Sequence, residues 1–84
     1  MINIKIYCNK KHEAYERVYE IIYETMFESN ISFEIKRISE PKVLRMQNIV
    51  SEPHVVFNNQ VVYTKNVSSK EELKTILQKL KLIK

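Results

Sequence analysis

The 84-residue chain is long enough for one small domain, and its 44% hydrophobic and 29% charged residues are typical of a folded protein, not of a disordered chain. A single cysteine excludes an internal disulfide framework and a cysteine-rich metal site, and a net charge of +4 is too small to indicate a nucleic-acid partner. The sequence has no apolar run of membrane-spanning length and no signal-peptide block, so we expect a cytoplasmic protein without a membrane partner.

The first half of the chain predicts a strand, a long helix and a second strand. Ile2, Ile4 and Ile6 alternate with polar residues, which is the period of a half-buried strand. The same alternation returns over residues 31–36. Between them, from about Lys11 to Ser29, apolar residues recur at helical spacing. The predicted core-facing stripe of this helix comprises Ala14, Val18, Ile21, Ile22 and Thr25.

The second half predicts a short helix, a hairpin and a last helix. Pro41 suits the first turn of a helix that continues to about Ile49. Asn58-Asn59 separates two short β-branched and aromatic runs, a pattern typical of a type I′ hairpin. A capping box, Ser-x-x-Glu from position 69, begins the last helix. Its predicted buried stripe comprises Leu73, Ile76, Leu77 and Leu80.

The chain contains no glycine, so other residues have to occupy its left-handed backbone positions. Asparagine tolerates positive φ better than most residues, and the predicted loops contain several asparagines. We therefore expect left-handed turn positions at Asn9, Asn30, Asn58, Asn59 and Asn66.

The predicted order is βαβαββα in one domain of residues 1–84, an α/β fold with a mixed four-stranded sheet flanked by helices. The segment Ser-Glu-Pro-His from position 51, the following hairpin and the Ser-Lys-Glu-Glu helix start resemble the second half of small thioredoxin-like and glutaredoxin-like proteins. The resemblance extends over essentially the whole chain. It implies a thioredoxin-like fold, with Pro53 in the place of the family's cis-proline.

The family's redox chemistry depends on Cys-x-x-Cys between the first strand and the first helix, where helix amides stabilise a thiolate. In one alignment Cys8-x-x-Lys11 occupies this place, with lysine at the position of the resolving cysteine. In the other, His12-x-x-Tyr15 occupies it and Cys8 ends the strand. We favour the second alignment because the helical core positions then match the family. Either alignment excludes dithiol chemistry within one chain.

Two interpretations of Cys8 follow. As a monothiol nucleophile it would form a mixed disulfide with glutathione or a partner, and Lys10, Lys11 and the helix start would lower its pKa. The resemblance implies that these lysines, with the backbone of His54 and Val55, would hold the tripeptide. Otherwise Cys8 is an inert, buried residue at the end of a strand.

The remaining candidate residues suggest binding. Cys8, His12 and His54 form a weak candidate for a metal site, and we expect no metal there. A partner could bind at the end of the fold where the family carries its redox site, which we call the former active-site end. The residues expected there are Lys10, Lys11, His12, Tyr15, Pro53, His54 and Val55. A second apolar stripe on the long helix, with Met26 nearby, is a possible interface formed by Tyr19, Tyr23 and Phe27.

The sequence therefore favours a thioredoxin-fold protein without the redox dithiol, acting as a non-catalytic module that binds a protein partner or forms a homodimer. The alternative is a monothiol, glutaredoxin-like redox protein that acts through Cys8, with glutathione as its small-molecule ligand.

Overall fold

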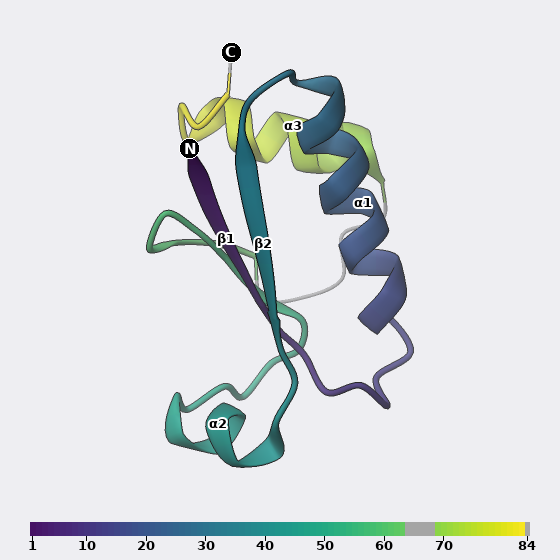
Figure 1. Cartoon of the computed structure of the whole chain (residues 1–84), viewed down its shortest axis with the longest axis vertical. Helices are drawn as coiled ribbons and strands as arrows, with labels where there is room; N and C mark the ends of the chain where they lie inside the picture. The colour runs from purple at the N-terminus through teal and green to yellow at the C-terminus, as the bar shows by residue number, and fades with distance from the viewer. Residues whose placement is uncertain (64–68, 84) are drawn as a thin grey trace.

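The computed structural model describes residues 1–63 and 69–83, and its elements follow the predicted order (Figure 1). The strands and helices are β1 (Ile2–Tyr7), α1 (Tyr15–Glu28), β2 (Phe33–Ile38), α2 (Pro41–Met46), β3 (His54–Phe57), β4 (Gln60–Tyr63) and α3 (Lys70–Lys79).

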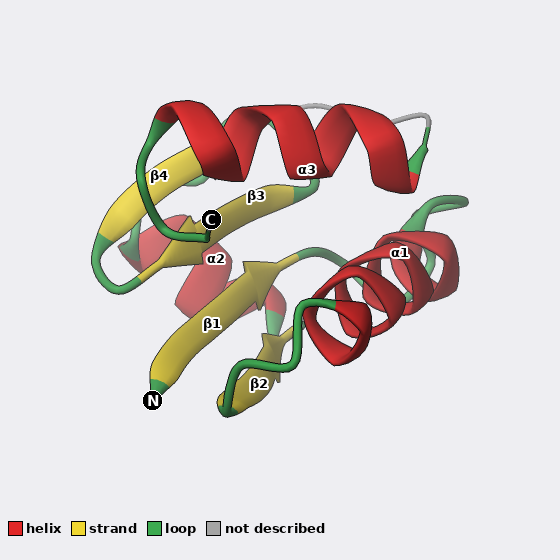
Figure 2. Cartoon of the chain, turned by 90° about the horizontal axis from the view of Figure 1, so that it is seen from above, coloured by secondary structure: helices red, strands yellow, loops and turns green. Residues whose placement is uncertain are grey.

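The four strands form one mixed sheet in the order β2-β1-β3-β4. β1 is parallel to β2, as a right-handed strand–helix–strand crossover requires, and antiparallel to β3, which continues into β4 through the hairpin. Helices α1 and α3 contact each other and cover one face of the sheet (Figure 2). The predicted α/β class, with a mixed sheet flanked by helices, is confirmed.

The hydrophobic core lies between the sheet and these two helices. The alternate residues of β1, Ile2, Ile4 and Ile6, are buried against them. The stripe predicted for α1 is buried at Ala14, Val18, Ile22 and Thr25 and partly buried at Ile21. Met26, expected near the second apolar stripe of this helix, is fully buried, because it lies one turn after Ile22 on the same helical face.

Helix α1 begins at Tyr15, four residues later than predicted. Side chains in the preceding loop accept hydrogen bonds from the backbone and hold it in turns. Asn9 Oδ1 accepts from the Lys11 amide at 2.9 Å, and His12 Nδ1 accepts from the Ala14 amide at 3.1 Å. Such local bonds compete with helix formation, and a loop therefore separates Cys8 from the helix start.

The hairpin turn has the predicted geometry. Asn58 and Asn59 have φ values of 49° and 67°, the pair of left-handed conformations that a type I′ turn requires. Asn58 also joins the turn to β1: its Oδ1 accepts from the Asn3 amide, and its own amide donates to the Asn3 carbonyl, both at 2.8 Å. One residue thus sets the turn and closes the end of the sheet.

The other asparagine predictions had mixed outcomes. Asn30 is left-handed at φ 59°, but Asn9 is not among the positive-φ residues, and Asn66 lies outside the described residues. Asn48, at φ 56°, ends α2 before the predicted Ile49, because a left-handed residue cannot continue a right-handed helix.

Helix α3 begins as the capping box predicts. The Ser69 hydroxyl accepts a hydrogen bond from the Glu72 amide at 3.2 Å, and Leu73 and Leu77 are fully buried below it. Lys70 Nζ lies 2.6 Å from Glu28 Oε2, so the start of α3 is joined to the end of α1.

Candidate functional site

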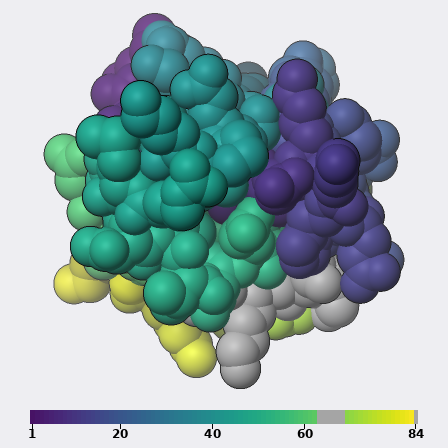
Figure 3. All heavy atoms as spheres, turned by 90° about the horizontal axis from the view of Figure 1, so that it is seen from below, coloured from purple at the N-terminus to yellow at the C-terminus, as the bar shows by residue number. Residues whose placement is uncertain are grey.

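Two loops meet at the end of the sheet where β1 stops and β3 begins. In Figure 3, which shows this end, the purple loop after β1 lies beside the green segment before β3. The Asn9 amide donates to Glu52 Oε1 at 2.5 Å, and the rings of Tyr7 and His54 meet edge to face with centroids 5.8 Å apart. Pro53 is fully buried and follows a cis peptide bond. The predicted active-site end is therefore assembled from two distant segments.

Cys8 is fully buried at this end. Its amide donates to the Ile38 carbonyl at 3.1 Å, and its Sγ lies 3.7 Å from the Asn9 carbonyl oxygen. Burial, and to a smaller extent the charge of Glu52, raises the pKa of the Cys8 thiol to about 11. This shift is opposite to the one that the monothiol interpretation required, in which the neighbouring lysines and the helix start would lower the pKa of Cys8. The backbone amides at the start of α1 do not stabilise a Cys8 thiolate, because the helix begins only at Tyr15. The charge that acts on the thiol is the negative charge of Glu52, which disfavours ionisation.

The other predicted binding residues separate into two groups. Val55 is fully buried, and its backbone is paired with Ile6 and Tyr63 in the middle of the sheet. Lys10 and Lys11 are exposed, and Nδ1 of the His12 ring accepts a hydrogen bond from the Ala14 amide. A surface hollow beside the loop is lined by Lys10, His12, Glu13, Tyr15, Glu16 and Arg37.

Among the described residues, no group of three His, Cys, Asp or Glu side chains could hold a metal ion. The alternative of a site formed by Cys8, His12 and His54 therefore has no support in the structure.

The aromatic stripe of α1 forms a continuous surface beside β2. Tyr23 stacks on Tyr19 and on Phe27, with ring centroids 6.0 and 6.2 Å away, and meets Phe33 of β2 edge to face at 5.6 Å. Phe27 is 69% exposed and Tyr23 is 44% exposed. We call Tyr19, Tyr23, Phe27 and Phe33 the aromatic face.

Arg37 completes this surface and was missed by the sequence analysis. Its guanidinium carbon lies 4.2 Å from the ring centroid of Tyr19 and 5.2 Å from that of Tyr15. Arg37 Nη1 also donates a hydrogen bond to Glu16 Oε2 at 3.4 Å. The signal was available, because Arg37 shares the period-two face of Phe33 and Ile35, where a charged residue needs an aromatic or acidic partner.

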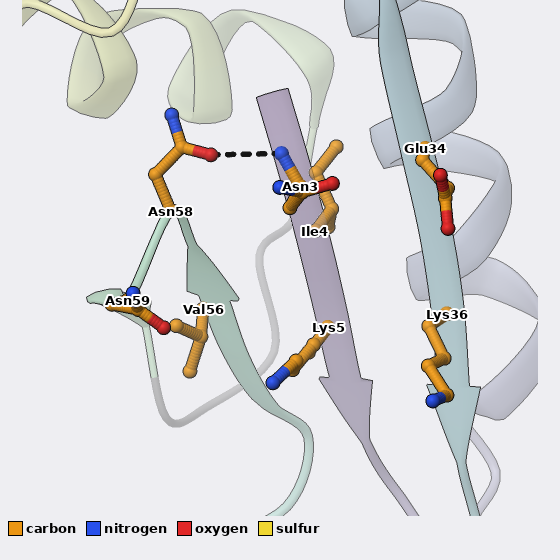
Figure 4. A pocket seen from close by; sticks show the side chains of 8 residues that line it. All are labelled: Asn3, Ile4, Lys5, Glu34, Lys36, Val56, Asn58 and Asn59. Atoms are coloured by element: carbon orange, nitrogen blue, oxygen red, sulfur yellow. Dashed lines mark hydrogen bonds between the residues drawn. The ribbon is translucent and has the colours of Figure 1, made fainter. Parts of the chain in front are cut away.

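The opposite face of the sheet carries polar residues around a hollow (Figure 4). Lys5 of β1 lies directly beside Lys36 of β2 in the parallel register, and Glu34 lies beside Asn3. The hollow is lined by Asn3, Ile4, Lys5, Glu34, Lys36, Val56, Asn58 and Asn59. The sequence predicted the strands but not this grouping, which depends on the register between them.

A family model described as a thioredoxin domain matches residues 2–78. The chain belongs to the thioredoxin-domain family. Within this family the chain departs from the redox pattern, because it has one cysteine and no Cys-x-x-Cys. The buried Cys8 is thus the only thiol available to this thioredoxin domain.

A solved structure agrees with this fold. A chain described as a malarial protein superposes with a TM-score of 0.69, covering 94% of this chain and 96% of its own length. At 12% identity the likeness concerns the thioredoxin fold alone. No curated protein matches the sequence significantly. Within the part of the chain that the structure describes, the helices are too short or too polar to cross a membrane.

Proposed function

We propose that this thioredoxin domain is a non-redox module that binds a protein partner. The observation that carries the proposal is the state of Cys8. It is the only cysteine of the chain, its side chain is fully buried, and the pKa of its thiol is raised to about 11. Thiol–disulfide exchange needs a thiolate that can reach its target and, for release, a second thiol. Neither condition is met within this chain.

The alternative is a monothiol reaction of Cys8 with glutathione. The exposed Lys10 and Lys11 near the loop would favour an anionic ligand. A thiol whose pKa lies two units above its ordinary value, however, holds a roughly hundredfold smaller thiolate fraction at neutral pH. Burial of the sulfur adds a steric barrier to attack. The geometry therefore favours the binding function.

Alkylation of Cys8 by iodoacetamide between pH 7 and pH 10 tests the proposal. In the folded protein we expect the rate at neutral pH to be at least roughly a hundredfold lower than in the urea-unfolded chain. Glu52→Gln, which removes the charge and keeps an acceptor for the Asn9 amide, is expected to accelerate the reaction only modestly, because burial is the larger cause. A fast reaction with a midpoint below about pH 8.5 would establish the monothiol function instead.

The aromatic face is the better supported of the two binding surfaces. At the former active-site end, the Asn9 amide is already bonded to Glu52 and Pro53 is buried. On the aromatic face, Tyr23 and Phe27 leave much of their rings in solvent. Contiguous exposed aromatic area is characteristic of protein interfaces.

Phe27→Glu is expected to abolish binding to this face without changing the melting temperature, because the side chain is 69% exposed. Tyr19 is a poorer probe, since it is half-buried below Arg37. Val50→Glu introduces the same charge in place of another exposed apolar residue, 94% exposed, and should leave binding intact. Binding is measured by co-purification with the tagged chain, and equal recovery with both variants would exclude the aromatic face.

A further inference from the structure

Strand β2 is an edge of the sheet, and among the described residues it pairs with β1 alone. The Ile2 amide bonds the Ser32 carbonyl and the Cys8 amide bonds the Ile38 carbonyl, so even-numbered residues of this segment direct their backbone groups toward β1. Since these directions alternate along a strand, Phe33, Ile35 and Arg37 direct their N–H and C=O groups outward. An edge of this kind is a template for a further strand.

We propose that this edge pairs with β2 of a second copy of the chain, antiparallel, about a two-fold axis at Ile35. The inference goes beyond the proposed binding at the aromatic face, because it assigns a second copy of the chain to a different surface, the backbone edge of β2. With the axis at Ile35, the outward backbone groups of Ile35 bond their own counterparts, and those of Phe33 bond those of Arg37 in the second copy. The two sheets then continue into one, with α1 of each copy on the same face.

The charge pattern of β2 selects this register. Residues that lie opposite each other in an antiparallel pair point to the same face of the sheet. The two-fold axis therefore has to pass through a residue of β2 and not between two residues. An axis at Glu34 places two glutamates opposite each other, and an axis at Lys36 places two lysines opposite each other. Only the axis at Ile35 places Glu34 of each copy opposite Lys36 of the other. These are non-hydrogen-bonded positions, where cross-strand side chains are closest.

The same register would also place a negative charge beside Lys36, which has a like-charged neighbour in the monomer. Lys36 lies beside Lys5 in the parallel ladder, and both side chains are exposed on the open face of the sheet (Figure 4). Like charges directly beside each other are unfavourable, and Glu34 of the second copy would lie on the other side of Lys36. The opposite face gains as well, because Phe33 would face Arg37 of the second copy, a residue that already contacts aromatic rings.

Charged side chains on an edge strand usually discourage pairing, because an arbitrary neighbour offers them no counter-charge. The charges of β2 differ in that the strand is complementary to itself. They exclude other registers and other edges while permitting this one. The partner that fits is therefore a second copy rather than an unrelated strand.

Sedimentation velocity from micromolar to millimolar concentration tests the proposal. The wild-type chain is expected to form a dimer as concentration rises. Glu34→Lys and Lys36→Glu each replace two attractive pairs by two repulsive ones, and each should weaken dimerisation roughly tenfold or more. Mixed together, the two variants should form a heterodimer, because all four opposing positions then carry opposite charges. Lys42→Glu, at an exposed position of α2, should dimerise like the wild type.

Each outcome bears on the proposal, provided that circular dichroism shows every variant folded. A wild-type chain that stays monomeric at millimolar concentration overturns it. So does a dimer that survives both single substitutions, or a mixture of the variants that fails to restore association. These results are independent of thiol alkylation, so the failure of this inference is distinguishable from a failure of the proposed non-redox function.

Discussion

Phe57→Ala is expected to lower the unfolding free energy by about 3–5 kcal/mol, the usual cost of removing a large aromatic ring from a packed core. Phe57 is fully buried in β3, opposite Ile4 of β1 and Gln60 of β4. A small domain has a total stability of roughly 5–15 kcal/mol, so this loss is a large share of the whole. We expect the variant to be partly or fully unfolded at room temperature.

Urea denaturation followed by circular dichroism measures the effect, and the chain provides a matched control. Phe27→Ala removes the same ring from a side chain that is 69% exposed, and should change the unfolding free energy by less than about 0.5 kcal/mol. Similar losses for the two variants would contradict the assignment of Phe57 to the core and of Phe27 to the surface.

The domain should lose stability as pH rises from about 9 to 11. Below pH 9 the Cys8 thiol is neutral in both the folded and the unfolded chain. Above it, the unfolded chain ionises at the ordinary pKa of 9.0 while the folded protein holds its proton up to about 11. The unfolded state is therefore favoured by about 1.4 kcal/mol for each pH unit in this interval, or about 2–3 kcal/mol in all.

Comparison with Cys8→Ala isolates this contribution, because the two proteins differ only in the thiol. Urea unfolding at pH 8, 9, 10 and 11 should show the wild-type chain losing its advantage over the variant as pH rises. Two stability curves that stay parallel would show that the Cys8 pKa is not raised by folding.

The elements were predictable where one local signal decided them. Alternating isoleucines specify β1, two adjacent asparagines specify the hairpin, and a serine cap specifies the start of α3. The start of α1 was not predictable from apolar spacing, because Asn9 and His12 use side-chain bonds to hold the residues before Tyr15 in turns. Periodicity describes which face is buried and says little about where the first helical turn forms.

The site was less predictable because its properties depend on residues far apart in the sequence. In the monothiol interpretation Lys10 and Lys11 would lower the pKa of Cys8, whereas that pKa is decided by burial and by Glu52, which the fold brings to the Asn9 amide. Arg37 could have been flagged from its place on the inner face of β2. Its aromatic partners on α1, Tyr15 and Tyr19, follow only from the packing of helix against strand.

The late start of α1 has a consequence for attempts to restore enzymatic activity. A second cysteine in place of Lys11 would restore the Cys-x-x-Cys sequence. It would lie in a turn before α1, however, and not in the first turn of the helix. The thiol of Cys8 would still lack the helix amides that activate its counterparts. Recovery of oxidoreductase chemistry would require shortening the loop or moving the helix start, which is a rearrangement of the backbone and is out of reach of a single side-chain replacement.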